Sequence, residues 1–154
     1  MGYPNPYDFQ HTLGIGGKET VQFNDDGSID VNFLSTAVLN EATMVKISAD
    51  MTVVPVTAVT DQPLGLSLAG KEHASGKFTA VVKTPFVQIV RCIASGVLAA
   101  GDLIDAEALD ATTTLMKYKA HAAGDSIVGQ VLIGAADTAE AIVGIYRTPV
   151  LDPV

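Results

Sequence analysis

Apolar and polar residues alternate on both sides of a short turn near the start of the chain. The alternation runs through Val21–Phe23 and resumes through Ile29–Phe33. Between them, Asn24–Ser28 contains Asp26 and Gly27, and an Asp-Gly pair between alternating segments favours a tight hairpin turn. The pattern predicts a β-hairpin over residues 21–34.

The rest of the chain carries short segments rich in Val, Ile and Thr, separated by turn residues. Such regular spacing of short strands is typical of a sandwich or barrel. Ser35–Ala42 and Ala135–Ala141 are rich in Ala but too short to form stable helices on their own. We therefore expect an all-β fold with at most short helical turns. The predicted strands are 44–48, 52–56, 64–68, 78–83, 87–93, 103–105, 115–120, 127–133 and 141–147.

An internal repeat relates two parts of this region, about residues 37–85 and 101–149. Asp61–Gly70 matches Asp125–Gly134 at an offset of 64, which pairs Asp61 with Asp125 and Gly65 with Gly129. Turn-forming Gly and Pro fall at matching places, and such residues fix backbone geometry. A duplicated β unit is the natural interpretation. At the same offset, without a gap, Lys83–Pro85 meets Arg147–Pro149, Ala58 meets Ala122, Ala42 meets Ala106 and Leu39 meets Leu103.

The first 20 residues differ from the rest and predict an extended arm. They contain Pro4 and Pro6, which restrict the backbone, and a run of glycines. Tyr3, Tyr7 and Phe9 place aromatic rings on this segment, where they would be left in water in isolation. We expect the arm to dock onto another subunit or a capsid surface, with packing on its own subunit as the alternative. Residues 21–154 would then form one β domain.

Composition favours a protein that is completed by neighbours. The 154 residues are 48% hydrophobic and 17% charged, which leaves few charges to cover the outside. Partly hidden surface, as in an oligomer, is therefore expected. The net charge of −8 argues against a nucleic-acid partner. No apolar run reaches membrane-spanning length, and the single Cys92 permits no internal disulfide.

Three segments resemble chemical motifs without completing them. Gly14–Thr20 lacks the first Gly of a phosphate-binding loop and has Glu19 where Ser or Thr is needed. Asn24–Asp30 resembles a calcium loop, but Gln22 and Phe33 occupy positions that need acidic residues. Gly65–Ala69 is one residue short of a nucleophile elbow. We interpret these as a hinge, a solvated turn and a strand.

Isolated reactive side chains also fail to form a site. His11, His73 and His121 lack metal-ligand spacing, and Cys92 lies in an apolar strand, as expected of an inert thiol. Aspartates in the repeated turns are expected to bond to their own backbone. We predict no catalytic residue, cofactor or metal. The residues expected to have structural roles in turns are Asp26, Gly27, Asp61, Gly65, Gly101, Asp102, Asp125 and Gly129.

Three turn-containing segments carry a resemblance to a known family. Ile93–Ile104, Ala58–Gly65 and Ala122–Gly129 resemble the capsid cement, or head decoration, proteins of tailed bacteriophages. The resemblance covers about residues 42–148 and rests on turn residues such as Gly101 and Asp102. The chain departs from the family pattern by carrying about 40 residues ahead of the shared region.

The resemblance implies a small β-barrel or sandwich of the β-clip type that forms homotrimers. Such a protein binds the major capsid protein on the outer surface of the phage head and stabilises the head against internal DNA pressure. It is a structural virion protein, assembled in the host cytoplasm, and not an enzyme. Its contacts in this chain are expected at Tyr3, Pro4, Pro6, Tyr7 and Phe9.

Two other functions stay open from the sequence. A small-ligand or glycan-binding β-barrel module would need a concave site with convergent polar or aromatic groups. Trp is absent, and aromatic residues gather in the arm, which counts against that function. A hydrolase on a trimeric β scaffold comes third, with Asp61 and Asp125 as its candidate residues.

Overall fold

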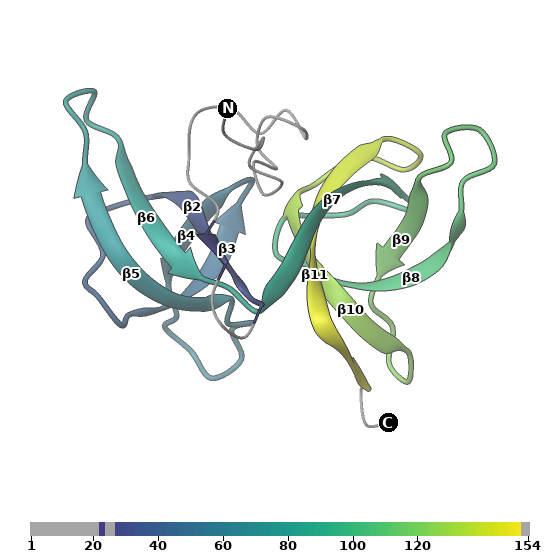
Figure 1. The fold of residues 1–154 in the computed structure, drawn as a ribbon, viewed down its shortest axis with the longest axis horizontal. Helices are drawn as coiled ribbons and strands as arrows, with labels where there is room; N and C mark the ends of the chain where they lie inside the picture. Colours follow the sequence, from purple (N-terminus) through teal and green to yellow (C-terminus); the bar gives the residue numbers. More distant parts are fainter. Residues whose placement is uncertain (1–21, 24–26, 152–154) are drawn as a thin grey trace, which may run out of the picture. The chain divides into compact units, whose positions relative to one another are not determined.

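The computed structural model describes residues 22–23 and 27–151, and within these ranges the chain forms strands and no helix (Figure 1). Tight Gly- and Asp-containing turns separate β-branched segments, which accounts for a strand-only fold. The strands are β1 Gln22–Phe23, β2 Ile29–Ser35, β3 Met44–Ala49, β4 Thr52–Pro55, β5 Gly65–Glu72, β6 Phe78–Lys83, β7 Phe86–Ala94, β8 Leu103–Leu109, β9 Met116–Ala120, β10 Ser126–Ile133 and β11 Glu140–Leu151.

The strands group into two compact units, whereas the sequence led us to expect one β domain over residues 21–154. The first unit contains Thr52–Pro85 and the chain up to Lys46, and the second contains Ile47–Met51 and Phe86–Val154. Each unit closes its own strands around its own apolar interior, as described below. The predicted hairpin is present as an antiparallel pairing of β1 with β2, in which Phe23 lies opposite Ile29.

In the first unit, the strands follow the order β1-β2-β4-β3-β5-β6, and a further pairing of β6 with β2 closes the ring. β2 runs parallel to β4 and antiparallel to β6. Alternate residues of β2 point inward, so Ile29, Val31 and Phe33 are buried, together with Val53 and Val82 from neighbouring strands. This alternation is the apolar pattern from which the hairpin was predicted.

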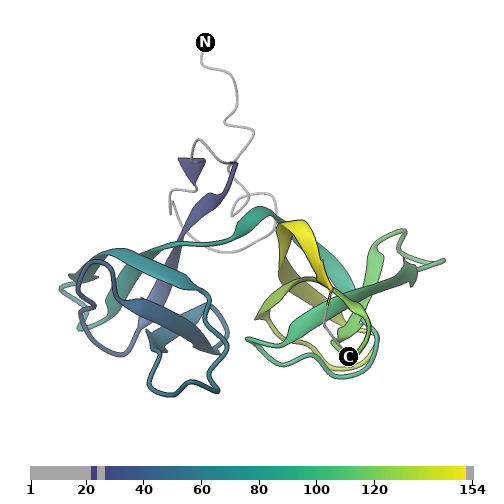
Figure 2. The same cartoon turned by 90° about the horizontal axis from the view of Figure 1, so that it is seen from below.

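The second unit is a closed barrel with the order β10-β11-β7-β9-β8. Figure 2 shows the green and yellow strands of this unit curving into a ring. β7 runs parallel to β9 and antiparallel to β11. The interior of the barrel is filled by apolar side chains, as in other small barrels. The buried residues are Cys92, Ala94, Leu98, Ile104, Tyr118, Val131, Ala141 and Val143.

The two units share one topology. If β2–β6 correspond in order to β7–β11, every strand has the same neighbours in both rings, and the first and third strands are parallel in each. Both copies also carry a β-bulge at the same place, at Leu68 in β5 and at Leu132 in β10. The same strand order and the same bulge indicate that the chain contains a duplicated barrel.

Loop contacts repeat as well. The Ala42 N–H donates to Ser67 O at 2.7 Å, and the Gly101 N–H donates to Val131 O at 2.8 Å. Gly70 lies against the backbone of Leu39, just as Gly134 lies against that of Leu98. The correspondence therefore extends from strand order to individual hydrogen bonds.

The gap-free offset of 64 predicted for the whole repeat is wrong outside β5 and β10. Gly65 does correspond to Gly129, but their strand partners Val45 and Ile104 differ by 59 residues. The same holds for Ala42, which corresponds to Gly101 rather than to Ala106. The offset changes because the connections differ in length: residues 50–51 join β3 to β4, whereas residues 110–115 join β8 to β9.

The matches proposed at the ends of the repeat shift for the same reason. Lys83 lies opposite Leu66, and the corresponding residue opposite Gln130 is Gly144, so Lys83 does not correspond to Arg147. Leu39 corresponds to Leu98 and not to Leu103. Insertions and deletions between the strands thus hide the true register from a gap-free comparison.

Candidate functional site

The turn before β5 is held by the carboxylate of Asp61. One oxygen accepts hydrogen bonds from the N–H groups of Thr57, at 2.8 Å, and Ala58, at 3.0 Å. The other oxygen lies 2.6 Å from Lys46 Nζ on β3. The Lys46 ammonium, followed by the Thr57 N–H, lowers the pKa of Asp61 from 3.8 to about 2. The turn is therefore ordered by a permanently charged cap.

The same turn presents an apolar side chain to solvent. Val59 is fully exposed at its tip, between Ala58 and Asp61. An exposed valine is unremarkable by itself. It differs from most such residues because the backbone that carries it is fixed on both sides by the Asp61 carboxylate.

Two turns of the second unit follow the same design. Val97 is 73% exposed, and the preceding Gly96 N–H donates to Asp137 Oδ1 at 2.8 Å. Leu109 is 68% exposed and precedes Asp110, whose carboxylate accepts bonds from the Thr113 N–H and hydroxyl, both at 2.8 Å. We call Val59, Val97 and Leu109 the apolar turn tips. Each lies on a turn that an aspartate holds in place.

The counterpart of the Asp61 turn in the second unit is built from different charges. There the Ala122 N–H donates to Asp105 Oδ2 at 3.0 Å, and Asp105 Oδ1 lies 2.7 Å from His121 Nδ1. Asp125, the counterpart of Asp61, instead pairs with Lys119 at 3.0 Å. Asp105 occupies the β8 position that corresponds to Lys46. An aspartate on a strand thus caps the turn in the second unit, where the turn's own aspartate does so in the first.

The Asp105–His121 pair resembles two members of a hydrolytic triad, but no activated nucleophile accompanies it in the hydrogen bonds of the described residues. Burial raises the pKa of the Cys92 thiol to about 11, which keeps it protonated and unreactive. Ser67 points into the first unit, and its Oγ is buried without a hydrogen-bond partner. Among residues 22–23 and 27–151, no group of three or more His, Cys, Asp and Glu side chains could hold a metal.

The glycines singled out from the sequence lie where a side chain would clash or strain the backbone. A Cβ on Gly65 would lie 2.0 Å from Lys83 O, and one on Gly129 would lie 2.1 Å from Gly144 O. Gly27 and Gly101 have φ values of 81° and 94°, in the left-handed region that favours glycine. The matched glycines of β5 and β10 therefore allow two strands to approach closely.

Asp102 caps the turn that follows the second loop. Its Oδ2 accepts a hydrogen bond from the Ala99 N–H at 2.9 Å, so its carboxylate also bonds to nearby backbone. Asp61 and Asp102 thus share one kind of contact. Asp125 differs, because its described partner is Lys119.

Sequence reasoning missed several residues that organise these turns. Asp105, His121, Asp110 and Asp137 were not singled out, although each binds a turn. An Asp followed by Thr113 could have signalled the Asp110 turn, because Asp commonly accepts bonds from residues two or three positions later. The bond of Asp137 to Gly96 joins residues far apart in sequence, so no local signal marks it.

Several predicted features lie outside the described residues. These are the arm with Tyr3, Pro4, Pro6, Tyr7 and Phe9, the Gly14–Thr20 segment, His11, and Asp26 of the hairpin turn. Within the described ranges, the chain has no helix that is long and apolar enough to cross a membrane. Compared with models of known protein families and with curated protein sequences, the chain matches none.

Proposed function

We propose that this chain is a structural protein that decorates the outer surface of a bacteriophage head and stabilises it against internal DNA pressure. One observation carries the proposal: three turns held by aspartates present Val59, Val97 and Leu109 to solvent. A turn that is ordered before binding loses little conformational entropy when it docks. Ordered apolar tips therefore suit a protein whose role is to bind other proteins.

The number of such tips supports a binding role in a symmetric assembly. Each tip is small, so each contact contributes modest affinity on its own. When many subunits bind a shell, or several tips bind at once, weak contacts combine through effective concentration. A cement protein needs this kind of surface and no reactive group. The low charged fraction of 17% fits a chain that neighbours cover in part.

The resemblance to head decoration proteins supports the same function. Two of its segments, Ala58–Gly65 and Ile93–Ile104, contain Val59 and Val97. The family likeness and the apolar turn tips therefore involve the same parts of the chain. In this proposal the partners are the major capsid protein and further copies of the chain in a homotrimer, with Tyr3, Tyr7 and Phe9 of the arm making further contacts. The chain would act without a cofactor and would not be an enzyme.

Binding to undecorated heads tests the function. Expanded heads that lack the protein are mixed with the purified chain, and the bound fraction is measured after sedimentation. We expect saturable binding, which Val59→Asp combined with Val97→Asp weakens by about 100-fold, because two apolar contacts are replaced by desolvated charges. Thr138→Asp is the matched control, because Thr138 is exposed but is not one of the apolar turn tips.

A second arm of this experiment addresses the N-terminal segment. Removal of residues 1–20 should lower occupancy if the arm docks on the head or on a neighbouring subunit. Unchanged occupancy would remove the arm from the proposal and leave the turn tips as its basis. No binding of the full chain to heads, together with specific binding to a glycan array, would overturn the decoration function.

A further inference from the structure

The duplication allows the two barrels to be compared position by position, and they differ in how one strand is covered. Leu132 at the bulge of β10 is 0% exposed and Gln130 is 1% exposed. Their counterparts on β5, Leu68 and Leu66, are 37% and 39% exposed. A position that is buried in one copy of the repeat is thus open in the other.

The second unit shows what covers this position. Ile47–Met51 belongs to that unit and contains a tight turn between strands. The Met51 N–H donates to Leu132 O at 3.0 Å, and Asp50 Oδ1 accepts a bond from the Gly134 N–H at 2.9 Å. The bulge of β10 is therefore covered by a turn that carries an aspartate.

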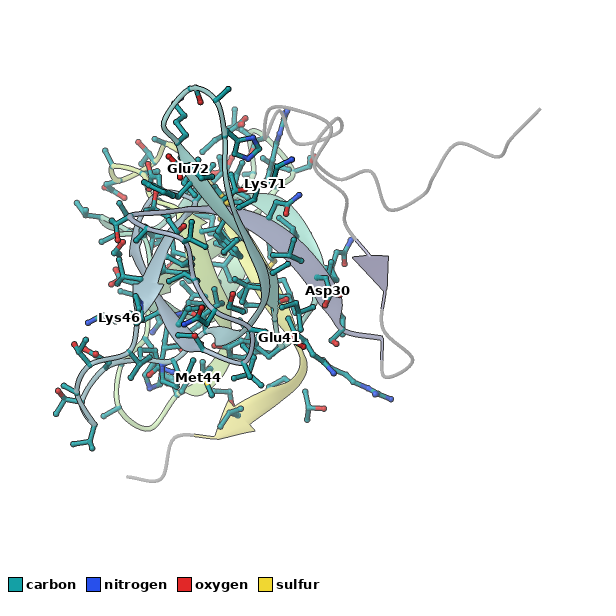
Figure 3. The ribbon with its side chains drawn as sticks, turned by 90° about the vertical axis from the view of Figure 1, so that its left-hand side faces the viewer. Asp30, Glu41, Met44, Lys46, Lys71 and Glu72 are labelled. Atoms are coloured by element: carbon teal, nitrogen blue, oxygen red, sulfur yellow. The ribbon has the colours of Figure 1, made fainter. Side chains whose placement is uncertain are left out.

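On β5 the corresponding positions form an open apolar face. Met44 lies directly opposite Leu66, so the two exposed side chains share the outer face of the sheet. Lys83 lies opposite Leu66 on the other side, and Lys71 follows Leu68 along β5. We call these five residues the β5 face. Figure 3 labels Met44 near one end of this face and Lys71 near the other.

Charge indicates what kind of surface fits the β5 face. In the described part of the first unit, four lysines balance four carboxylates, so its formal net charge is zero. The described part of the second unit has eight carboxylates and four cations, a formal net charge of −4. The residues of the second unit are Asp50, Asp102, Asp105, Glu107, Asp110, Asp125, Asp137 and Glu140, against Arg91, Lys117, Lys119 and Arg147.

The β8–β9 turn combines an apolar tip with negative charge. Leu109 is exposed at the end of β8, between Glu107 and Asp110. Asp110 holds the turn through Thr113, and its charge persists at neutral pH because these bonds lower its pKa. A leucine flanked by carboxylates complements leucines flanked by Lys71 and Lys83. Like the turn that covers β10, this is a strand-to-strand turn with an aspartate.

We propose that the β5 face of one copy of this chain binds the β8–β9 turn of a second copy. The contact is heterologous, because different surfaces of the two copies meet, and it forms a closed ring if the rotation between copies closes. This inference does not rest on capsid binding. It concerns the free protein and would hold for any function of the assembly.

Self-association of the full chain tests the proposal, measured by sedimentation velocity over a concentration series. Leu68→Asp and Leu109→Asp should each weaken association by about tenfold or more, because each places a charge in the contact. Leu34→Asp is the matched control, because Leu34 is exposed to a similar degree but lies on β2. Far-UV circular dichroism and thermal midpoints establish that each variant is folded.

A mixing experiment distinguishes this contact from others. Leu68→Asp retains an intact turn, and Leu109→Asp retains an intact β5 face, so an equimolar mixture should form a heterodimer although each variant alone is monomeric. A two-fold symmetric contact of one face with itself would give no such rescue. If an aspartate variant does not fold, Lys83→Glu and Glu107→Lys replace it, since each should weaken association and their mixture should restore it.

Three results would overturn the proposal. The first is a wild-type chain that stays monomeric at every concentration. The second is a Leu109→Asp variant that associates as the wild type does. The third is loss of association on removal of residues 1–20 while Leu109→Asp still associates, which would assign the β5 face to the arm. Head binding is measured separately, so a failure there leaves these outcomes unchanged.

Discussion

Lys46 Nζ lies 2.6 Å from Asp61 Oδ1, and the corresponding positions of the second barrel hold Asp105 and Asp125. One copy of the repeat thus places a cation and an anion together, and the other places two carboxylates. The second barrel accommodates this change by pairing Asp105 with His121 and Asp125 with Lys119. The same turn is therefore held by different charges, with different consequences for stability.

The Asp61 cap predicts a dependence of stability on pH. The pKa of Asp61 is about 2 in the folded chain, below 3.8, because Lys46 and the Thr57 N–H bind its charged form. A carboxyl group whose pKa falls on folding stabilises the fold above its unfolded pKa and loses that contribution as the pH falls through its folded pKa. The free energy of unfolding, measured by urea titration, should therefore fall more steeply between about pH 4 and 2 in the wild type than in Asp61→Asn.

Lys46→Met provides the control for this prediction. It removes the partner that lowers the Asp61 pKa most and leaves the carboxylate in place. Its stability should be less sensitive to pH in the same window than that of the wild type. Parallel curves for the wild type and Asp61→Asn would show that the cap makes no contribution.

The close approach of β5 to β6 predicts a severe effect of one added methyl group. A Cβ on Gly65 would lie 2.0 Å from Lys83 O, so the strands must separate to admit it. We expect Gly65→Ala to lower the free energy of unfolding by about 3 kcal/mol, as in strongly overpacked sites. Gly76→Ala is the control, since Gly76 has φ of 74° but open space around it, and strain there should cost about 1 kcal/mol. Equal effects of the two substitutions would contradict the close packing of β5 on β6.

Burial of Cys92 predicts a slow thiol. Its pKa of about 11 lies two units above the ordinary 9.0, so roughly 100-fold less thiolate is present at pH 8. Labelling with a disulfide reagent should be at least about 100-fold slower in buffer than in urea, since the side chain is also sheltered from the reagent. Comparable rates in the two conditions would mean that Cys92 is accessible in the folded protein.

Phe86 is predicted to anchor the second barrel. Its buried ring lies against Gly144 and stacks on Tyr146, with ring centroids 5.7 Å apart. Phe86→Ala should lower the free energy of unfolding by about 3–5 kcal/mol, the range for a buried aromatic ring. Val97→Ala should change it little, because Val97 is largely exposed. A small effect of Phe86→Ala in thermal or urea unfolding would mean that the barrel closes without this ring.

Much of the strand structure could be predicted from the sequence because local signals agreed. The segment 78–83 is predicted as a strand and forms β6 with those bounds, since β-branched residues there lie between turn residues. The pairing of strands was harder to predict. Gly65 and Gly129 mark one matching pair of strands, but loop insertions change the offset elsewhere, and loops accept insertions at little cost.

The turn aspartates could be predicted in part. Asp61 binds the backbone of residues three and four positions earlier, which a local pattern can suggest. The Asp105 contact with His121 and the Asp137 contact with Gly96 depend on which strands and loops meet. The exposure of Leu66 and Leu68 could not be predicted either, because the equivalent residues of the other barrel are buried. Burial depends on what covers a strand, and the strand's own sequence does not contain that information.

The central claim, that the chain decorates a phage head, is tested most directly by quantitative mass spectrometry of purified virions. The virions are those of the phage that encodes the chain, purified by density gradient so that loosely bound protein is removed. The account predicts that the chain is present in a fixed ratio to the major capsid protein in every preparation. Absence of the chain from intact virions that contain the capsid protein would contradict the account.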